Sequence, residues 1–327
     1  MRRREFIALL GGAATWPLGA SAQQGERMRR IGVLANLVEN DPEAVARFSA
    51  FRKAMQELGW MEGRNLQIET RWGVENDRIR MNAAELVALG PDVVLANAPP
   101  TVMALQQLTH SLPIVFVGVT DPVGMGIVRS LSRPGGNATG FTVAEFGMSA
   151  KWLELLKEIA PGVTRAAVLR DLSNPSALPQ FAAIQAMASS LRIELIPVGV
   201  HDEGEIARGI GPFAEFSNGG LIITRTSETI KYRDVIIKSA ARHRLPAVYP
   251  LRFFVTSGGL IAYGTDVVDQ YRRAATYVDR VLRGEKPSDL AVQDPVKYEL
   301  AINLKTAKAL GLEVPPTLLA RADEVIE

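Results

Sequence analysis

LPIVFV at residues 112–117 runs on to GGNATG at residues 135–140, and the same order of patterns returns much later in the chain. There, LPAVYP at residues 245–250 runs on to GGLIAYG at residues 258–264. In each copy an apolar, strand-like run follows a helix-like run, and a Gly-Gly pair precedes a second strand-like run. This internal similarity predicts two similar α/β halves, and two halves imply a cleft between them.

Strand and helix patterns alternate outward from this repeat in both directions. The predicted strands are apolar runs without polar alternation, which are typical of parallel strands covered by helices on both faces. They fall at residues 31–35, 65–72, 92–96, 113–119, 166–170, 193–200, 220–224 and 247–249, with helical patterns between them. We therefore expect an α/β fold with two doubly wound parallel-sheet lobes.

The chain is expected to cross between the lobes three times, near residues 140, 264 and 295. Several crossings make a multi-strand hinge, on which stiff lobes can close around a ligand. The expected N-terminal lobe consists of residues 29–140 and 264–295, and the C-terminal lobe of residues 141–263 and 296–327. The sequence leaves open which of the two lobes holds the last segment. We expect a final helix over residues 317–325.

The first 22 residues have the pattern of an export signal. A basic start (RRREFI, residues 2–7) precedes an apolar run over residues 8–18, and ASA at residues 20–22 fits the small-x-small cleavage rule. The arginine pair followed by Phe6-Ile7 fits a twin-arginine signal, with an ordinary Sec leader as the alternative. The apolar run is too short to span a bilayer comfortably. We expect a soluble exported protein, which in a Gram-negative cell is periplasmic.

Composition excludes several classes of protein. The chain has no cysteine, which excludes a disulfide framework, a thiolate nucleophile and a cysteine metal cluster. The leader carries three arginines and one glutamate, so its removal takes the formal net charge from +2 to 0. A neutral mature chain lacks the basic surface that nucleic-acid binding requires. The hydrophobic content of 47% is sufficient for the cores of two lobes.

Motif searches give no catalytic or cofactor site. No dinucleotide-binding glycine motif, P-loop or nucleophile elbow occurs at a strand-to-helix turn. The three histidines are scattered, and His110 and His243 fall near predicted helix ends, where the helix dipole favours histidine. We expect no catalytic residue, no metal and no cofactor.

Polar side chains follow the predicted strands, at the edge where open α/β sheets bind ligands. Hydroxyl, amide and carboxylate groups at helix-opening loops suit hydrogen bonds to a small solute. The candidate ligand-binding residues are Asn36, Glu39, Asn97, Thr101, Thr120 and Asp121 in the first half, Asn174, Ser176, Thr224, Thr226 and Tyr249 in the second, and Tyr263 at an expected hinge. For each of them the alternative is a helix cap or a core position. Asp121, which precedes a proline like a helix cap, is the favoured acceptor for a ligand ammonium.

Longer stretches carry a resemblance to a known family. They are GWMEGRN (59–65), AAELVAL (83–89), PIVFVGVTDPVGMG (113–126), RPGGNATGF (133–141), ARHRLPAVYP (241–250), GGLIAYGTD (258–266), YRRAATYV (271–278), INLKTAKAL (302–310) and PPTLLARADEVIE (315–327). In this order they resemble exported ABC-transporter substrate-binding proteins of the tryptophan/tyrosine-type family, a branch of the type I periplasmic binding proteins. The resemblance covers nearly all of the mature chain.

The resemblance implies a clamp-like receptor without a catalytic step. Such a receptor captures a small solute, here an amino acid or a similarly sized aromatic or carboxylate solute, and delivers it to an ABC permease in the inner membrane. Delivery to a permease favours a monomer. Two alternatives stay open. One is an exported α/β hydrolase or lyase that uses the carboxylates of Asp121 and Glu39 in the cleft, and the other is a sensory protein that presents its ligand to a membrane receptor.

Overall fold

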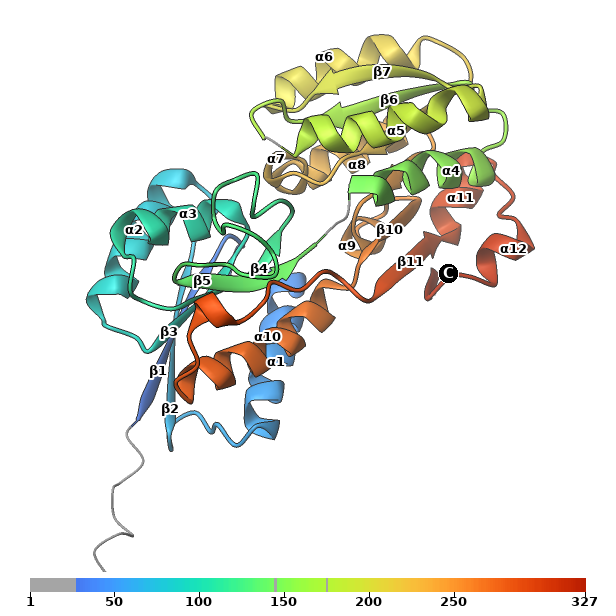
Figure 1. The fold of residues 1–327 in the computed structure, drawn as a ribbon. Helices are drawn as coiled ribbons and strands as arrows, with labels where there is room; N and C mark the ends of the chain where they lie inside the picture. The colour runs from blue at the N-terminus through green and yellow to red at the C-terminus, as the bar shows by residue number, and fades with distance from the viewer. Residues whose placement is uncertain (1–27, 144–145, 175) are drawn as a thin grey trace, which may run out of the picture.

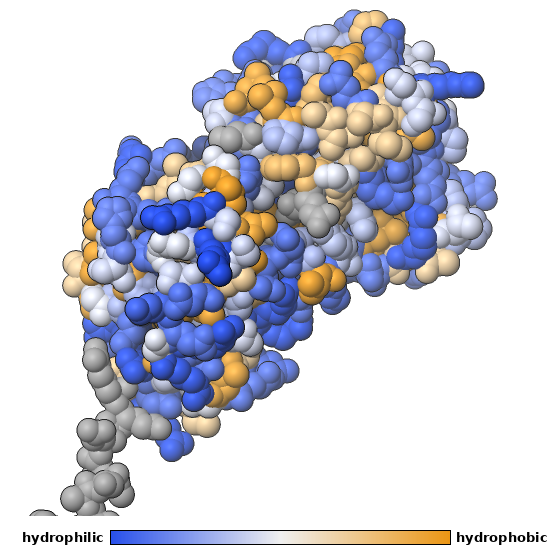
Figure 2. Space-filling model, viewed as in Figure 1, coloured by the Kyte–Doolittle hydropathy of each residue, from blue (hydrophilic) through white to orange (hydrophobic). Residues whose placement is uncertain are grey.

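The computed structural model describes residues 28–143, 146–174 and 176–327. The predicted export signal over residues 1–22 lies outside this part of the chain. Figure 1 shows two α/β lobes, each built on its own sheet and covered by helices. The predicted α/β fold class with two doubly wound lobes is confirmed. Figure 2 shows that the molecule narrows between the lobes and that the visible face is mostly hydrophilic.

The first sheet has five parallel strands in the order β2-β1-β3-β4-β5. The strands are β1 (Arg29–Ala35), β2 (Leu66–Trp72), β3 (Val93–Asn97), β4 (Ile114–Val119) and β5 (Ala138–Thr142). One face carries α1 (Pro42–Glu57) and α10 (Val267–Leu282), and the other carries α2 (Asn76–Ala88) and α3 (Pro99–Leu108). A 3-10 turn, η2 (Pro287–Asp289), follows α10 near β5.

The second sheet has seven strands in the order β12-β11-β10-β9-β8-β6-β7. They are β6 (Arg165–Arg170), β7 (Glu194–Gly199), β8 (Gly219–Ile223), β9 (Ala247–Tyr249), β10 (Ile261–Thr265), β11 (Tyr298–Asn303) and β12 (Glu324–Ile326). Its helices are α4 (Ser149–Ile159), α5 (Ala177–Leu191), α11 (Leu304–Leu310) and α12 (Pro316–Leu319) on one face, and α6 (Glu203–Ala214), α7 (Ser227–Lys231), α8 (Arg233–Arg242) and α9 (Arg252–Thr256) on the other, with the 3-10 turn η1 (Phe146–Met148) before α4. β11 is antiparallel to β10, so this sheet is mixed rather than wholly parallel.

Alternating side chains of the strands fill a core on each face of the sheets. In β1, Val33 packs among side chains of α1 and α10, and its neighbour Leu34 packs among those of α2 and α3. Successive side chains of a strand point to opposite faces, so a strand covered on both sides needs an apolar residue at every position. α1 begins where Asp41 Oδ1 accepts a hydrogen bond from the Glu43 amide at 2.9 Å and Pro42 fills the first turn.

The segments that run between the lobes lie against one another. The Thr142 amide, at the end of β5, donates to the Gln293 carbonyl at 2.9 Å. The Thr265 hydroxyl, at the end of β10, donates to the Val143 carbonyl. The predicted boundaries at 140 and 264 fall inside β5 and β10, so these two crossings come about two residues later than expected. No helix in the described part of the chain is both long enough and apolar enough to cross a membrane.

The sequence repeat has a counterpart in the backbone. A Cβ atom on Gly140, in β5, would lie 2.0 Å from the Phe116 carbonyl oxygen, and one on Gly264, in β10, would lie 1.9 Å from the Pro250 carbonyl oxygen. Both distances are far below contact, so only glycine fits at either position. The last glycine of each copy therefore packs directly on the backbone of the strand-like run that opens the same copy.

Two local predictions are wrong. The expected helix over residues 317–325 is instead the short α12 followed by β12, which adds a parallel edge strand to β11. Asp323 Oδ2 accepts a hydrogen bond from the Leu300 amide at 2.8 Å, which holds the tail against the sheet. Residues after Asp121 form turns rather than a helix, and Asp121 Oδ1 accepts from the Gly124 amide at 2.8 Å.

Candidate ligand-binding site

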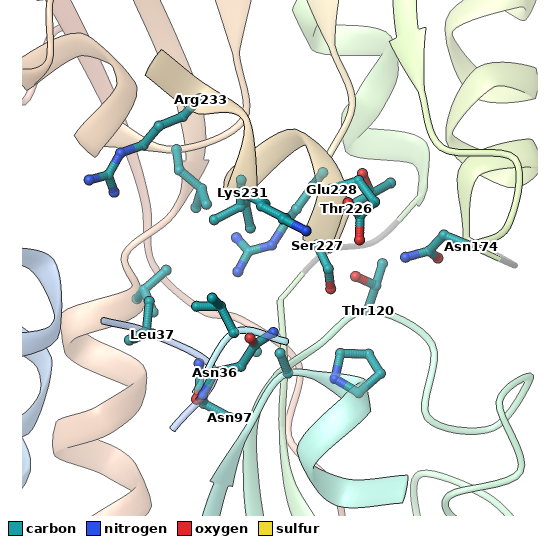
Figure 3. Close-up of a pocket in the computed structure, with 18 of the residues that line it drawn as sticks. Asn36, Leu37, Asn97, Thr120, Asn174, Thr226, Ser227, Glu228, Lys231 and Arg233 are labelled. Carbon is teal, nitrogen blue, oxygen red and sulfur yellow. Dashed lines mark hydrogen bonds between the residues drawn. The ribbon is translucent and has the colours of Figure 1, made fainter. Parts of the chain in front are cut away.

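A cavity of about 240 Å³ lies between the two lobes, at the carboxyl ends of the parallel strands. Loops after β1, β3 and β4 form its first-lobe wall, and loops after β6 and β8 form its second-lobe wall. Figure 3 shows Asn36, Asn97 and Thr120 on one side of this space and Asn174 and Thr226 on the other. A cavity of this size at the strand ends suits one small molecule.

Hydrogen bonds between loops fix the first-lobe wall. The backbone N–H of Asn36 donates to Asn97 Oδ1 at 2.6 Å, which ties the loop after β1 to the end of β3. The Thr101 hydroxyl donates to the Asn97 carbonyl at 2.7 Å, so α3 begins directly behind the wall. Leu37 and Met125 add apolar surface beside these polar groups. Mixed walls of this kind bind small solutes by apolar contact and a few placed hydrogen bonds.

Short polar motifs fix the second-lobe wall. Asn174 Oδ1 accepts from the Ser176 amide at 3.0 Å and from the Ser176 hydroxyl at 2.6 Å, which shapes the loop that leads into α5. Thr226 caps α7 in a capping box with Thr229. Both motifs place short polar side chains at the cavity without leaving the loop backbone unsupported.

Arg225 follows β8 and lines the cavity with only 8% of its surface exposed. Gln180 holds its backbone on both sides, because Oε1 accepts from the Arg225 amide at 2.8 Å and Nε2 donates to the Arg225 carbonyl at 3.1 Å. The Arg225 guanidinium makes no hydrogen bond or ion pair with a described residue, and Arg225 Nη1 is fully buried. Burial, together with the positive charge of Arg47, lowers the pKa of Arg225 to about 9.

Two more buried polar side chains reach the same cavity from the first lobe. Arg47, on α1, is 6% exposed, and its Nη2 lies 3.5 Å from Glu43 Oε2 while its Nε has no partner among the described residues. Tyr271, on α10, is 1% exposed, and its hydroxyl likewise lacks a hydrogen-bond partner in the described chain. Burial raises the pKa of the Tyr271 phenol.

Two ion pairs join the lobes at the cavity. Arg233, on α8, lies 2.9 Å from Asp41, the residue that caps α1. Lys231, at the end of α7, lies 3.2 Å from Glu75, which precedes α2. The Asp41 pair is the more buried of the two and is therefore the less screened by solvent. Both pairs exist only while the lobes stand close together.

Six of the twelve predicted site residues line the cavity. They are Asn36, Asn97, Thr120, Asn174, Ser176 and Thr226. Each lies at the carboxyl end of a strand or in the loop that follows it, which is the rule that selected it. No group of three or more His, Asp or Glu side chains in the described ranges is placed to hold a metal ion.

Two predicted aromatic residues lie elsewhere. Tyr249 is 1% exposed and stacks on Phe254 at a ring separation of 5.1 Å, inside the core below the second-lobe wall. Tyr263 stacks on Tyr298 at 6.0 Å, and its carbonyl accepts from Trp152 Nε1 at 2.8 Å. The core alternative therefore describes both residues better than ligand contact, because each ring already packs against another ring.

Four predicted polar residues also lie outside the cavity. Thr101 and Thr224 are fully buried and satisfy their hydroxyls on backbone carbonyls, Thr224 on that of Leu169 at 2.7 Å. Asp121 caps its own turn through Gly124. Glu39 is exposed and lines a separate surface groove on the first lobe. The carboxylate pair on which the enzyme alternative depended therefore does not face the cavity.

Sequence reasoning missed Arg47, Arg225 and Tyr271. Arg225 stands between two candidates, Thr224 and Thr226, at a strand end where a positive charge is unusual for a buried loop. Arg47 lies on the apolar face of α1, one turn from Ala44 and next to Phe48. A cation at a core position of an amphipathic helix is a signal that the periodicity of the sequence contains.

The fold and the inter-lobe cavity are those of a type I periplasmic binding protein. The family model described as ABC transporter substrate binding protein matches residues 30–326, and the chain belongs to this family. The tyrosine-binding protein of Clostridioides difficile (strain R20291) is 26% identical over 290 residues, which cover 88% of this chain and 82% of that protein.

Solved structures show the same fold. A conserved domain protein from Vibrio cholerae has a TM-score of 0.83 at 26% identity, covering 91% of this chain and 100% of that one. The ABC domain from Streptococcus pneumonia in complex with L-Trp has a TM-score of 0.83 at 24% identity, covering 91% and 99%. The ligand-free, open structure of an adhesive substrate-binding protein from Clostridium difficile has a TM-score of 0.70 at 24% identity, also covering 91% and 99%.

Proposed function

We propose that this protein is the solute receptor of an ABC importer. It captures one small molecule in the inter-lobe cavity, closes around it and delivers it to a permease, without changing any bond of the solute. The observation that carries the proposal is a cavity lined from both lobes at the carboxyl ends of their strands, in a chain of the substrate-binding family. The proposal includes export to the periplasm and a monomeric receptor.

The proposed solute is an amino acid or an aromatic or carboxylate solute of similar size. The names of two related proteins, one a tyrosine-binding protein and one solved with L-Trp, support this class. The wall chemistry is compatible with it, since amide and hydroxyl groups such as Asn97 and Thr226 stand beside apolar surface from Leu37 and Met125.

Closure by hinge motion is part of the proposal, with lobes formed by residues 29–140 and 264–295 and by residues 141–263 and 296–327, apart from the two-residue shifts at β5 and β10. Sheet membership of the strands supports this division. In a closed arrangement, charged side chains of the two lobes come within reach of one another. The Arg233–Asp41 and Lys231–Glu75 pairs fit that arrangement.

A thermal-shift screen of the mature protein tests the proposal. Its arms are the twenty amino acids, aromatic acids, nucleosides and sugars, each far above its dissociation constant. Selective binding to the folded state stabilises it by about 2.7 kcal/mol at a hundredfold excess over Kd, which corresponds to a melting shift of about 5 °C. We expect such a shift from at least one amino or aromatic acid. Stabilisation by no compound of any class, or turnover of a solute that binds, would contradict the proposal.

A further inference from the structure

Three buried polar groups without partners meet at one cavity. Arg225 Nη1, Arg47 Nε and the Tyr271 hydroxyl each lack a hydrogen-bond partner among the described residues, and all three residues line the inter-lobe cavity. Each side chain is more than nine-tenths buried. Buried polar groups in folded proteins are nearly always satisfied, because leaving one unpaired costs about 1–3 kcal/mol, and more when it is charged.

The three groups share one chemistry. A guanidinium only donates hydrogen bonds, and a protonated phenol donates one, so together they present donors and positive charge. All three side chains line the same cavity, and the positive charge of Arg47 contributes to lowering the pKa of Arg225. Two buried cations that line one cavity repel each other, and an anion bound between them offsets this repulsion.

No carboxylate in the part of the chain that the structure describes forms an ion pair with Arg225. Among the acidic residues that line the cavity, Asp41 is paired with Arg233 at 2.9 Å, and Asp234 lies 3.5 Å from the same guanidinium. Glu228 makes no ion pair with a described residue, and the main cation acting on its pKa is Lys231 rather than Arg225. The Arg225 guanidinium is therefore a charge whose counter-ion is missing from the described chain.

The balance of charge in the cavity sets the kind of anion. Of the four cationic side chains that line it, Arg47, Lys231 and Arg233 are paired with Glu43, Glu75 and Asp41, so Arg225 is the one cation there without an ion pair among the described residues. A carboxylate carries one negative charge, and its two oxygens accept the paired N–H donors of an arginine. A phosphate monoester carries close to two and would leave the balance negative.

We infer that Arg225, together with Arg47 and Tyr271, binds the carboxylate of the transported solute. This inference rests on the proposed function and names the group by which the solute is recognised. Arg225 belongs to the second lobe, while Arg47 and Tyr271 belong to the first, so a carboxylate between them contacts both lobes at once. Such contacts exist only in the closed arrangement, and a solute that makes them shifts the population toward closure.

Pairs of compounds that differ only in this group test the inference by thermal shift and calorimetric titration. The pairs are L-tryptophan and L-tryptophanamide, L-tyrosine and L-tyrosinamide, indole-3-acetate and indole-3-acetamide, and benzoate and benzamide, with inorganic phosphate as a further arm. We expect at least one acid to bind and its amide to bind about 100-fold more weakly, which is the loss of a charge-assisted pair.

Variants assign the effect to residues. Arg225→Met keeps most of the side-chain volume and should abolish the difference between acid and amide, and Tyr271→Phe should weaken the acid about 10-fold while leaving the amide unchanged. Without any solute, Arg225→Met should also melt higher than the natural protein, because it removes a buried charge that lacks a counter-ion. Arg242→Met, which removes an exposed cation from α8, is the matched control and should change none of these values.

Several results would overturn the inference while sparing the proposed function. They are an amide that binds as tightly as its acid, binding of neutral solutes or phosphate alone, and an Arg225→Met variant that keeps the preference for the acid. Failure of every compound class, sugars and nucleosides included, would instead reject the proposed function itself. A natural protein that melts above the solute-free Arg225→Met variant would show that the guanidinium has a structural partner, and would also count against the inference.

Discussion

One side chain, Glu299, lies in an environment that disfavours its charged form. Glu299, on β11, lines a second cavity together with Glu43, Arg47, Arg252 and Asp266. Burial, with the negative charge of Asp266 adding to it, raises the pKa of Glu299 from its usual value of 4.5 to about 7. The folded protein therefore prefers this carboxyl in its neutral form.

The raised pKa predicts how stability depends on pH. Between about pH 4.5 and pH 7 the folded state holds the Glu299 proton more tightly than the unfolded state, so this group's contribution to the free energy of unfolding decreases as pH rises. Glu299→Gln should remove that slope and be more stable than the natural protein at pH 8, on the order of 1 kcal/mol after solvent screening. Urea unfolding at several pH values measures both curves. Parallel curves for the two proteins would show that the shift is absent.

At the residue scale, sequence reasoning found the cavity residues that lie at strand ends and missed those that lie on helices. The rule that ligands lie beyond strand ends selected Asn36, Asn97 and Thr226, because strand ends are visible in the apolar pattern. It cannot separate Thr226 from Thr224, which lies two positions earlier and turns its hydroxyl to a backbone carbonyl. Arg47 and Tyr271 enter the cavity from helices, so a rule about strand ends has no means of finding them.

At the scale of elements, the repeated glycine links the sequence pattern to strand packing. Gly264, in β10, packs on the Pro250 carbonyl as Gly140, in β5, packs on that of Phe116. Each of these strands is the last element of its sheet before the chain crosses to the other lobe. The repeat therefore marks the two places where strands must approach closely for the crossings to form.

Gly264→Ala tests this explanation. A methyl group placed 1.9 Å from the Pro250 carbonyl oxygen forces the backbone apart, and we expect a loss of about 2–4 kcal/mol in the free energy of unfolding. Gly136→Ala is the control, because nothing lies within 4 Å of a Cβ atom there, and it should change stability by about 0.5 kcal/mol or less. Denaturant melts of both variants provide the measurement. Equal stability of the two variants would mean that the strands separate without cost.

The predicted elements succeeded where the signal is local. The buried strands follow from uninterrupted apolar runs, in which each residue packs on one face of the sheet or the other. β12 was missed because its three residues become a strand only by pairing with β11, from Ala301 to Asn303. Contacts between distant segments decide such edge strands, and a single sequence carries little trace of them.

At the scale of the whole molecule, the lobes are joined by apolar packing and by ion pairs. Besides the hinge segments, the Arg233–Asp41 and Lys231–Glu75 pairs join the lobes at the cavity. Ion pairs with partial exposure contribute at most about 1 kcal/mol each, so they cannot hold the lobes together by themselves. In the proposed mechanism, a solute that contacts both walls would supply the remaining free energy of closure, so that closure would report binding.

The distance between the lobes, measured by pulsed electron resonance with a spin label on each lobe, tests this account most directly. The chain has no cysteine, so Leu108→Cys on α3 and Ser190→Cys on α5, both exposed, are the only sites that label. We predict a broad distribution of label distances without solute. Saturation with the solute that stabilises most in the thermal-shift screen should give a narrower distribution at shorter distance. An unchanged distribution at saturation would contradict a receptor that closes around its solute.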